Sequence, residues 1–171
     1  MKPLALGIDI GTTALKAVLL DPEHGIVGQA ERAHTLHSAF PGWAEEDPNE
    51  WWATTCAATR ELTAQVEPGR IAVVGVTGMV PALVLQGPDG VVLRRSIQQN
   101  DARSVVEVEE LRAAVDPEEF LRRTGGLPNQ QNVAPRWRWL AKHEPAVTAR
   151  CATLCGSYDF IAQRLTGVRT L

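Results

Sequence analysis

The residues with the clearest chemical potential lie near the start of the sequence, in the stretch "GIDIGTTALKAV". A short apolar run ends in Asp9, and Gly11, Thr12 and Thr13 follow before apolar residues resume. Glycine lets backbone N–H groups approach a ligand closely, and threonine hydroxyls can bond phosphate oxygens. Asp9 could hold Mg²⁺ through water, and Lys16 adds a positive charge. The same residues also fit an ordinary hairpin with a capping aspartate, and spacing alone leaves both interpretations open.

The elements around this turn are predicted to be strands. Residues 4–9, 14–20 and 26–34 form a three-stranded meander, with turn residues at 21–25. The stretch has no G-x-G-x-x-G pattern and continues as a strand, so no helix N-terminus is expected to hold phosphate here. Any phosphate site in this turn therefore depends on backbone N–H groups and hydroxyls.

Helix and strand signals alternate after residue 47. Asp47 as N-cap, Pro48 at N1 and Glu50 at N3 predict a capping box and a helix that stops at Pro68-Gly69. The run "RIAVVGVTG" predicts a buried strand, and residues 103–114 predict a helix. Further strands are expected in "ALVLQ" and "VVLRRSI". Further helices are expected from near Asp116-Pro117 to Gly125-Gly126, from Pro135, and in "SYDFIAQRL". This order indicates an α/β fold with a mixed sheet flanked by helices, not a doubly wound sheet.

Composition excludes several classes of function. The chain has 171 residues and a formal net charge of −3, which does not favour nucleic acid or an anionic membrane as a partner. No signal peptide or membrane span is predicted, so we expect a cytoplasmic protein of one domain. His34 and His37 are expected at the surface. The three cysteines, Cys56, Cys151 and Cys155, form neither a disulfide framework nor a zinc pattern.

Five segments in register resemble the FGGY carbohydrate kinases, members of the actin-like ATPase superfamily with its ribonuclease H-like fold. "GIDIGTTALKAVLLD" is similar to the first phosphate motif of that family, and "FPGWAEEDPNEWW" to the stretch before its first long helix. The other similar segments are "IAVVGVTGMVPALVLQGPDGVVLRRSIQQNDARS", "TGGLPNQQNVAPRWRWLAKHEP" and "DFIAQRLTG". The xylulokinase-like members match best.

The resemblance implies roles for individual residues. Asp9 would position Mg²⁺ and the transferring phosphoryl group, and ATP would be the donor. The residues that line the nucleotide phosphates would be Gly11, Thr12 and Thr13, with Lys16 beside them. The residues on the side of a small-molecule sugar substrate would be Met79, Val80, Asn100, Asp101 and Arg103. Asp101 or Asn100 also fits as the N-cap of the following helix, and for Asp101 both roles stay open.

Two departures from the family pattern are visible. Gly78-Met79-Val80-Pro81 stands where xylulokinases carry Gln-Met-His-Gly, and "QQND" replaces Trp-Asn-Asp, which favours another ketose or a polyol. The sequence also stops at Leu171, before the family's catalytic aspartate and its C-terminal lobe. Residues 1–171 are therefore expected to be a truncated N-terminal lobe, inactive alone, with the general base beyond Leu171.

Other functions are compatible with the same residues. The chain could be a non-catalytic remnant that binds sugar or pairs with a partner lobe. An actin-like assembly ATPase is a third possibility, which the sugar-side segments over 71–103 disfavour. Because a truncated lobe leaves apolar surface and a strand edge uncovered, self-association is also expected.

Overall fold

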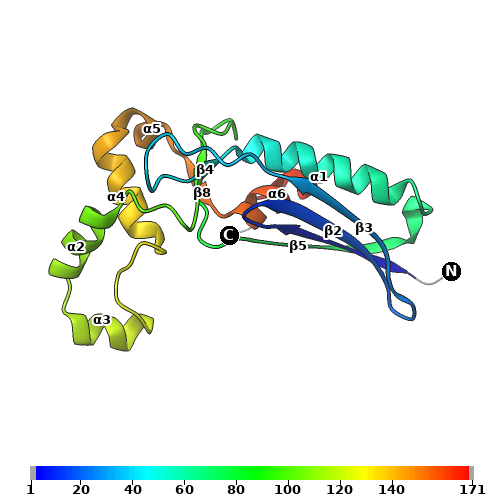
Figure 1. Ribbon diagram of the computed structural model, residues 1–171, viewed down its shortest axis with the longest axis horizontal. Coiled ribbons are helices and arrows are strands. Elements are labelled where there is room, and N and C mark those ends of the chain that lie inside the picture. Colours follow the sequence, from blue (N-terminus) through cyan, green and yellow to red (C-terminus); the bar gives the residue numbers. More distant parts are fainter. Residues whose placement is uncertain (1–2, 170–171) are drawn as a thin grey trace. The chain divides into compact units, whose positions relative to one another are not determined.

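The chain folds as two interleaved compact units in the computed structural model, which describes residues 3–169 and, for Pro68, only the main chain. The first unit comprises the residues up to Leu36, Glu46–Met79 and the residues from Cys155 onward. The second comprises His37–Glu45 and Val80–Leu154. The chain therefore passes between the units four times, as the colours of Figure 1 allow the reader to follow.

A four-stranded sheet forms the first unit, in the order β3-β2-β1-β5. β1 and β2 pair antiparallel, as do β2 and β3, which confirms the predicted meander. β5 pairs with β1 in parallel. The four strands are β1 (Leu4–Ile10), β2 (Ala14–Asp21), β3 (Gly25–Ala33) and β5 (Ile71–Gly78). The sheet is thus mixed, as the order of sequence patterns indicated.

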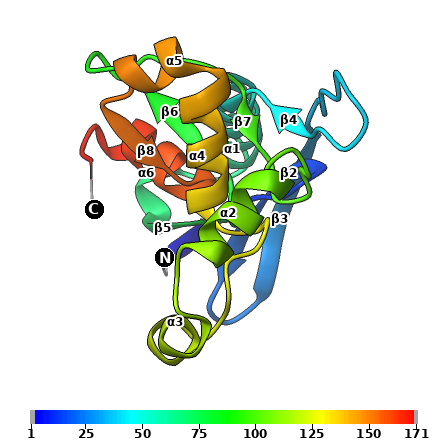
Figure 2. The ribbon, with the colours of Figure 1, turned by 90° about the vertical axis from the view of Figure 1, so that its left-hand side faces the viewer.

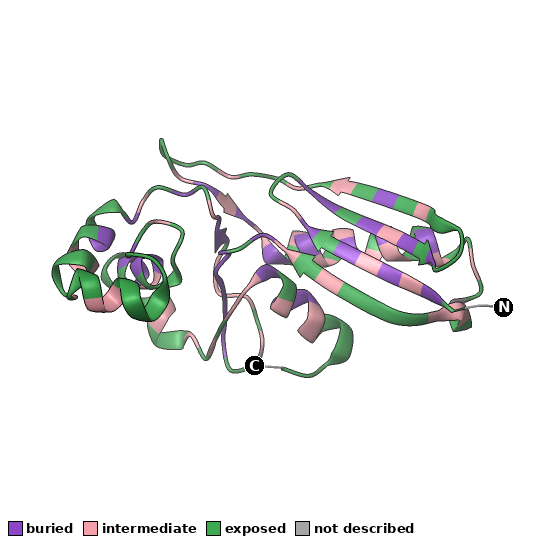
Figure 3. Ribbon diagram, turned by 90° about the horizontal axis from the view of Figure 1, so that it is seen from below, coloured by how far each residue is buried: buried purple, intermediate pink, exposed green. Residues whose placement is uncertain are grey.

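Two helices cover one face of this sheet, α1 (Pro48–Thr63) and α6 (Ser157–Thr166). Alternate strand residues point toward them, which gives β1 and β2 their striped burial in Figure 3. Trp51, Leu62 and Phe160 are fully buried from the helix side. The sheet residues facing them include Leu4, Leu6, Ile8, Ile10, Leu15, Ala17 and Leu19.

The start of α1 matches the prediction only in part. Asp47 is the N-cap, and its carboxylate accepts a hydrogen bond from the backbone N–H of Asn49 at 2.8 Å. The predicted capping box is wrong, because Glu50 accepts hydrogen bonds from the N–H and the hydroxyl of Thr35, at 3.0 and 2.8 Å. Glu50 therefore ties the segment after β3 to α1. The helix ends at Thr63, and a 3₁₀ turn, η1 (Pro68–Arg70), follows before β5.

β5 lies where the sequence predicts a strand, but the expected burial is wrong. Val73 is 58% exposed and Val74 46% exposed. Within residues 3–169 the strand pairs only with β1, so its outer edge is open, and Figure 3 colours most of it as exposed. A continuous apolar run is typical of a strand covered on both faces. The apolar sequence of β5 is therefore typical of a strand that is buried more fully than the described residues bury it.

The second unit is built from short strands and four helices. Its core consists of Leu83, Leu85, Ile97, Trp139 and Leu140. The elements are β4 (Glu45–Glu46, which crosses into the first unit), β6 (Val84–Gln86), β7 (Ser96–Ile97), β8 (Thr153–Cys155), α2 (Val105–Ala113), α3 (Pro117–Thr124), α4 (Val133–His143) and α5 (Pro145–Arg150). Figure 2 shows α2 beside α4.

The helix ends of the second unit test three predictions. α3 is capped as expected, by Asp116 at its start and by Gly125 with φ 76° at its end. α4 begins at Val133, two residues before the predicted Pro135. The expected cap of the following helix at Asn100 or Asp101 is wrong, because α2 begins at Val105 and its N-cap is Ser104. Asp101 is therefore available for another structural role.

Candidate functional site

The turn between β1 and β2 is tight, and its backbone is held in place. The N–H of Gly11 donates to the carbonyl of Ala14 at 3.1 Å, and the N–H of His34 donates to the carbonyl of Thr13 at 2.9 Å. A Cβ atom on Gly11 would lie 2.9 Å from the Ala14 carbonyl oxygen, so this close approach requires glycine. Thr12 and Thr13 are exposed. The turn thus presents two side-chain hydroxyls on a fixed backbone.

Asp9 and Lys16 lie directly opposite each other in the pairing of β1 with β2, and both are exposed. They belong to the face of the sheet opposite α1 and α6. A hollow of about 430 Å³ on this face is lined by both residues together with Gly7, Val18, Gly75 and Thr77. Thr77 is the register partner of Asp9 on β5, and sequence reasoning missed it.

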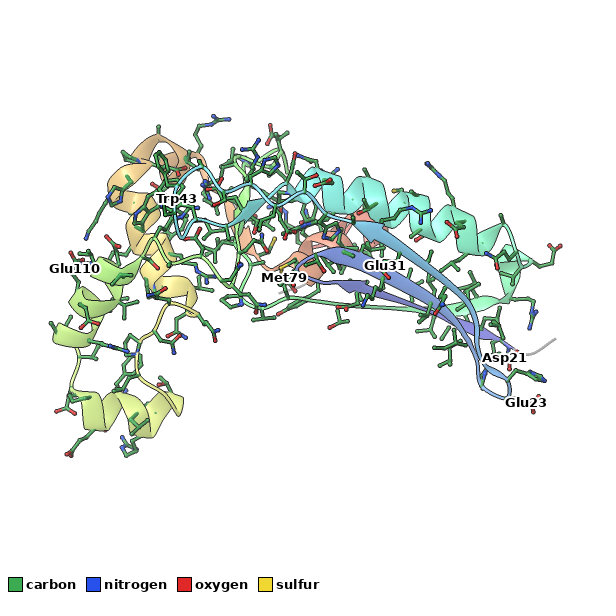
Figure 4. All side chains as sticks on the ribbon, in the orientation of Figure 1. Asp21, Glu23, Glu31, Trp43, Met79 and Glu110 are labelled. Carbon is green, nitrogen blue, oxygen red and sulfur yellow. The ribbon has the colours of Figure 1, made fainter. Side chains whose placement is uncertain are left out.

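The carboxyl ends of β1 and β5 meet beside this turn. The N–H of Met79 donates to the carbonyl of Ile10 at 2.9 Å, and the hydroxyl of Ser157 donates to the carbonyl of Met79 at 3.1 Å. A Cβ atom on Gly78 would lie 2.5 Å from the Ser157 hydroxyl, which explains glycine at the end of this strand. Met79, labelled in Figure 4, is buried. The predicted metal residue and the first predicted sugar residue therefore lie at one edge of one sheet.

In the second unit, the Asp101 carboxylate is buried and fully hydrogen-bonded. One oxygen accepts from the backbone N–H of Arg103 at 2.9 Å and from its Nε at 2.8 Å. The other accepts from the N–H of Ala44 at 2.6 Å and from Arg103 Nη2 at 2.7 Å. A carboxylate has about four acceptor positions, and these four bonds use them. Direct contact between Asp101 and a sugar stays a prediction, and this bonding argues against it.

Arg103 is equally enclosed. Its Nη1 lies 2.7 Å from Glu45 Oε1, and its guanidinium carbon lies 3.8 Å from the ring centre of Trp43 and 5.0 Å from that of Trp139. Burial disfavours the charged form, but the hydrogen bonds and charges of Asp101 and Glu45 outweigh it and raise the pKa of Arg103. The side chain is 1% exposed, so it acts here as a central support of the unit.

Asn100 and Val80 are the predicted sugar-side residues that are exposed, with Val80 at 61%. The residue after Val80 is Pro81, and the residue before Asn100 is Gln99. The backbone carbonyls of Pro81 and Gln99 each accept a hydrogen bond from Arg136, a buried residue of α4. Sequence reasoning missed Arg136. The sequence feature that could have identified it is an arginine on the apolar side of a helix, between Pro135 and Trp139, which are both buried.

His34 corrects another expectation, because its side chain is 0% exposed. Its Nδ1 lies 3.5 Å from Glu46 Oε2, and the same oxygen accepts from the Trp51 indole N–H at 2.7 Å. The histidine thus belongs to a buried polar group beneath α1, not to the surface. Residues 3–169 contain no cluster of three or more side chains able to hold a metal ion, and none of their helices has the length and apolar character of a membrane span.

Comparison with known proteins places this arrangement in a family. The model of the FGGY family of carbohydrate kinases, N-terminal domain, matches residues 4–171. A solved structure of a xylulose kinase from Rhodospirillum rubrum has 48% sequence identity and a TM-score of 0.93, covering 98% of this chain and 35% of that chain. The xylulose kinase of Escherichia coli is 30% identical over 162 residues, which is 95% of this chain and 33% of that protein. A glycerol kinase from Thermococcus onnurineus is 30% identical over 173 residues.

The fold and the family match thus define a carbohydrate kinase domain. The chain belongs to the FGGY family of carbohydrate kinases and corresponds to the N-terminal domain of that family. It spans about a third of the length of the curated relatives that it matches.

Proposed function

We propose that this chain forms the N-terminal part of an ATP-dependent carbohydrate kinase that phosphorylates a hydroxyl of a ketose or related polyol. The observation that carries the proposal is the position of Asp9, which faces Lys16 beside the Gly11–Thr13 turn, at the same sheet edge as Met79. Relatives named as xylulose and glycerol kinases support this class of reaction. Both ATP and such sugars are metabolites of the cytoplasm, and we include that location in the proposal.

On the nucleotide side, Asp9 would hold Mg²⁺. Magnesium keeps several waters and takes one or two carboxylates plus phosphate oxygens, so a single exposed aspartate fits it. When bound, MgATP supplies the phosphoryl group and a metal that neutralises developing charge. The hydroxyls of Thr12 and Thr13 would bind phosphate oxygens, with Gly11 allowing close approach. The Lys16 ammonium would add a positive charge beside Asp9.

On the sugar side, we assign contacts to Met79, Val80 and Asn100, and we assign Asp101 and Arg103 to the support of that segment. Val80 replaces a histidine of the xylulokinase pattern, and Gln99 replaces a tryptophan. A site that pairs substrate hydroxyls strongly rejects analogues without them, so these changes alter substrate choice. We therefore propose a ketose other than D-xylulose, or a polyol.

Residues 1–171 are proposed to lack the general base, and the chain alone to be inactive. Phosphoryl transfer depends on positioning and charge stabilisation, which an open half-site does not provide. The alternative is a non-catalytic module that binds sugar or a partner lobe, and the exposed edge of β5 favours it. A coupled ADP-release assay with ATP, Mg²⁺ and a panel of ketoses and polyols is expected to show no turnover by the chain alone. Sugar-dependent turnover would place a base within the chain and would contradict both the proposed inactivity and the non-catalytic alternative.

Binding of MgATP tests the proposal directly. Isothermal titration of the chain with MgATP is expected to give a Kd that rises at least about tenfold in Asp9→Asn, or about 1.4 kcal/mol. Without Mg²⁺ the two proteins should bind ATP equally. Glu31→Gln is the matched control, because Glu31 is an exposed acid opposite Lys16 on β3 (Figure 4) and should leave the Kd within twofold. Equal MgATP affinity of Asp9→Asn and the unmodified chain would overturn the assignment.

A further inference from the structure

Arg136 is a fully buried cation that binds two backbone carbonyls. Its Nη1 donates to the Pro81 carbonyl and its Nη2 to the Gln99 carbonyl, both at 2.9 Å. Its Nε is buried without a hydrogen-bond partner. Burial lowers the pKa of Arg136 to about 10, against the nearby charge of Asp101, so the side chain is charged at neutral pH. Burying a charge is costly, and this one is used to join two chain segments.

The two carbonyls flank exposed residues of the proposed sugar side. Pro81 directly follows Val80, and Gln99 directly precedes Asn100. Both segments and Arg136 lie in the second unit. The Asn100 segment is held further by the N–H of Asp101, which donates to the Gln98 carbonyl at 3.1 Å. Arg136 is thus the side chain of α4 that links the backbone beside Val80 to the backbone beside Asn100.

We infer that Arg136 is a positioning residue for a polyhydroxylated ligand, which fixes the spacing of the Val80 and Asn100 segments. The inference rests on the proposed function. A guanidinium is planar and presents its N–H groups in a rigid fork, so it can hold two carbonyls at a set separation. Lysine carries a compact charge on a flexible stem and does not reproduce this geometry. A residue needed only to fill the core could be apolar, at lower cost.

The first test measures the two segments themselves. Amide hydrogen exchange is followed at Leu83, whose N–H donates to the Ile97 carbonyl, and at Asp101. Arg136→Met keeps an unbranched side chain without donors, and we expect exchange at both sites to accelerate at least tenfold. Arg136→Lys should restore protection at no more than one of them. Arg138→Met is the control, because Arg138 lies two residues further along α4, is exposed and pairs with Glu110. Unchanged protection in Arg136→Met would overturn the inference.

The second test separates positioning from stability. NMR titrations with D-ribulose, a ketose other than D-xylulose, and with glycerol, a polyol, give affinities for the sugar side, and titration with MgATP gives nucleotide affinity. We expect Arg136→Lys to raise the sugar Kd at least tenfold and to leave the MgATP Kd within twofold. Equal sugar affinity in Arg136→Lys and the unmodified chain would overturn the inference while the proposed function stands. If the unmodified chain binds neither sugar, the proposed sugar side fails, and the exchange data alone decide the role of Arg136. If Arg136→Met does not fold, Arg136→Lys carries both measurements.

Discussion

Replacing Asp101 with asparagine tests whether this carboxylate is a support or a sugar ligand. Asparagine has nearly the same volume but no charge, and its amide nitrogen is a donor. Two of the four acceptor positions of Asp101 would then be lost, because the amide nitrogen would face two N–H donors, either those of Ala44 and Arg103 Nη2 or the backbone N–H and Nε of Arg103. Arg103 would keep one carboxylate partner, Glu45, at 2.7 Å. The change therefore breaks a buried pair from one side and leaves the fold's shape intact.

The expected loss follows from the burial of both partners, each 1% exposed at the side chain. Removing one partner of a buried ion pair costs about 3–5 kcal/mol. Because Glu45 still compensates Arg103, we expect the lower end, about 3 kcal/mol, in the free energy of unfolding. With a urea m-value of about 1–3 kcal/mol/M, the unfolding midpoint should fall by about 1–3 M.

Urea unfolding followed by tryptophan fluorescence measures this, since Trp43 and Trp139 flank Arg103. Trp43 is labelled in Figure 4. The control is Glu110→Gln, which removes a half-buried carboxylate paired with the more exposed Arg138 and Lys142 and should leave the midpoint nearly unchanged. An Asp101→Asn midpoint equal to that of the control would refute the supporting role. If the variant also lost sugar binding at full stability, Asp101 would be a ligand instead.

Three further predictions follow from packing and exposure. Gly78→Ala places a Cβ atom 2.5 Å from the Ser157 hydroxyl and should lower the free energy of unfolding, measured by chemical denaturation, by about 1–3 kcal/mol. Gly75→Ala is the control, because a Cβ atom there would meet nothing within 4 Å, and equal losses in the two variants would contradict the close approach. Val73→Lys with Val74→Lys should reduce dimers and larger species in light scattering, and Val168→Lys, also exposed but outside the sheet, should not. Burial raises the pKa of the Cys151 thiol, so in a variant with Cys56→Ala and Cys155→Ala it should react more slowly with a disulfide reagent at pH 8 when folded than in urea. The raised pKa means that the folded state binds the Cys151 proton more tightly than the unfolded state does, so the stability that this proton contributes is lost as the pH rises through the folded-state pKa. Equal reaction rates for the folded and the urea-unfolded protein would exclude the raised pKa.

Local signals predicted much of the fold because their chemistry is local. Asp47 with Pro48 started α1, and Asp116 with Gly125 bounded α3, since caps act within one helical turn. The meander followed from apolar runs and a turn. Partners distant in sequence could not be read this way. Glu50 has the spacing of a capping box, yet it binds Thr35, because the loop after β3 returns to the helix start.

The same difference between local and sequence-distant contacts applies to the candidate site. Asp9, Gly11 and the two threonines lie within one turn, so their proximity was predictable. The saturation of Asp101 was not, because two of its bonds come from one arginine side chain and another from Ala44, 57 residues away. Arg136 was missed for a similar reason. Its role depends on carbonyls 55 and 37 residues distant, and a helix pattern contains no record of backbone partners.

The interleaving of the two units bears on the order in which the protein is synthesised. The sheet of the first unit is complete at Gly78, but α6, which supplies Phe160 and Ile161 to its core, begins roughly 80 residues later. At a synthesis rate of about 5–20 residues per second, the finished strands wait about 4 to 16 s for that helix. During this interval the apolar face under α6 and the valines of β5 are open together. A nascent chain of this design is therefore a natural client for ribosome-associated chaperones until Ser157–Thr166 has left the exit tunnel.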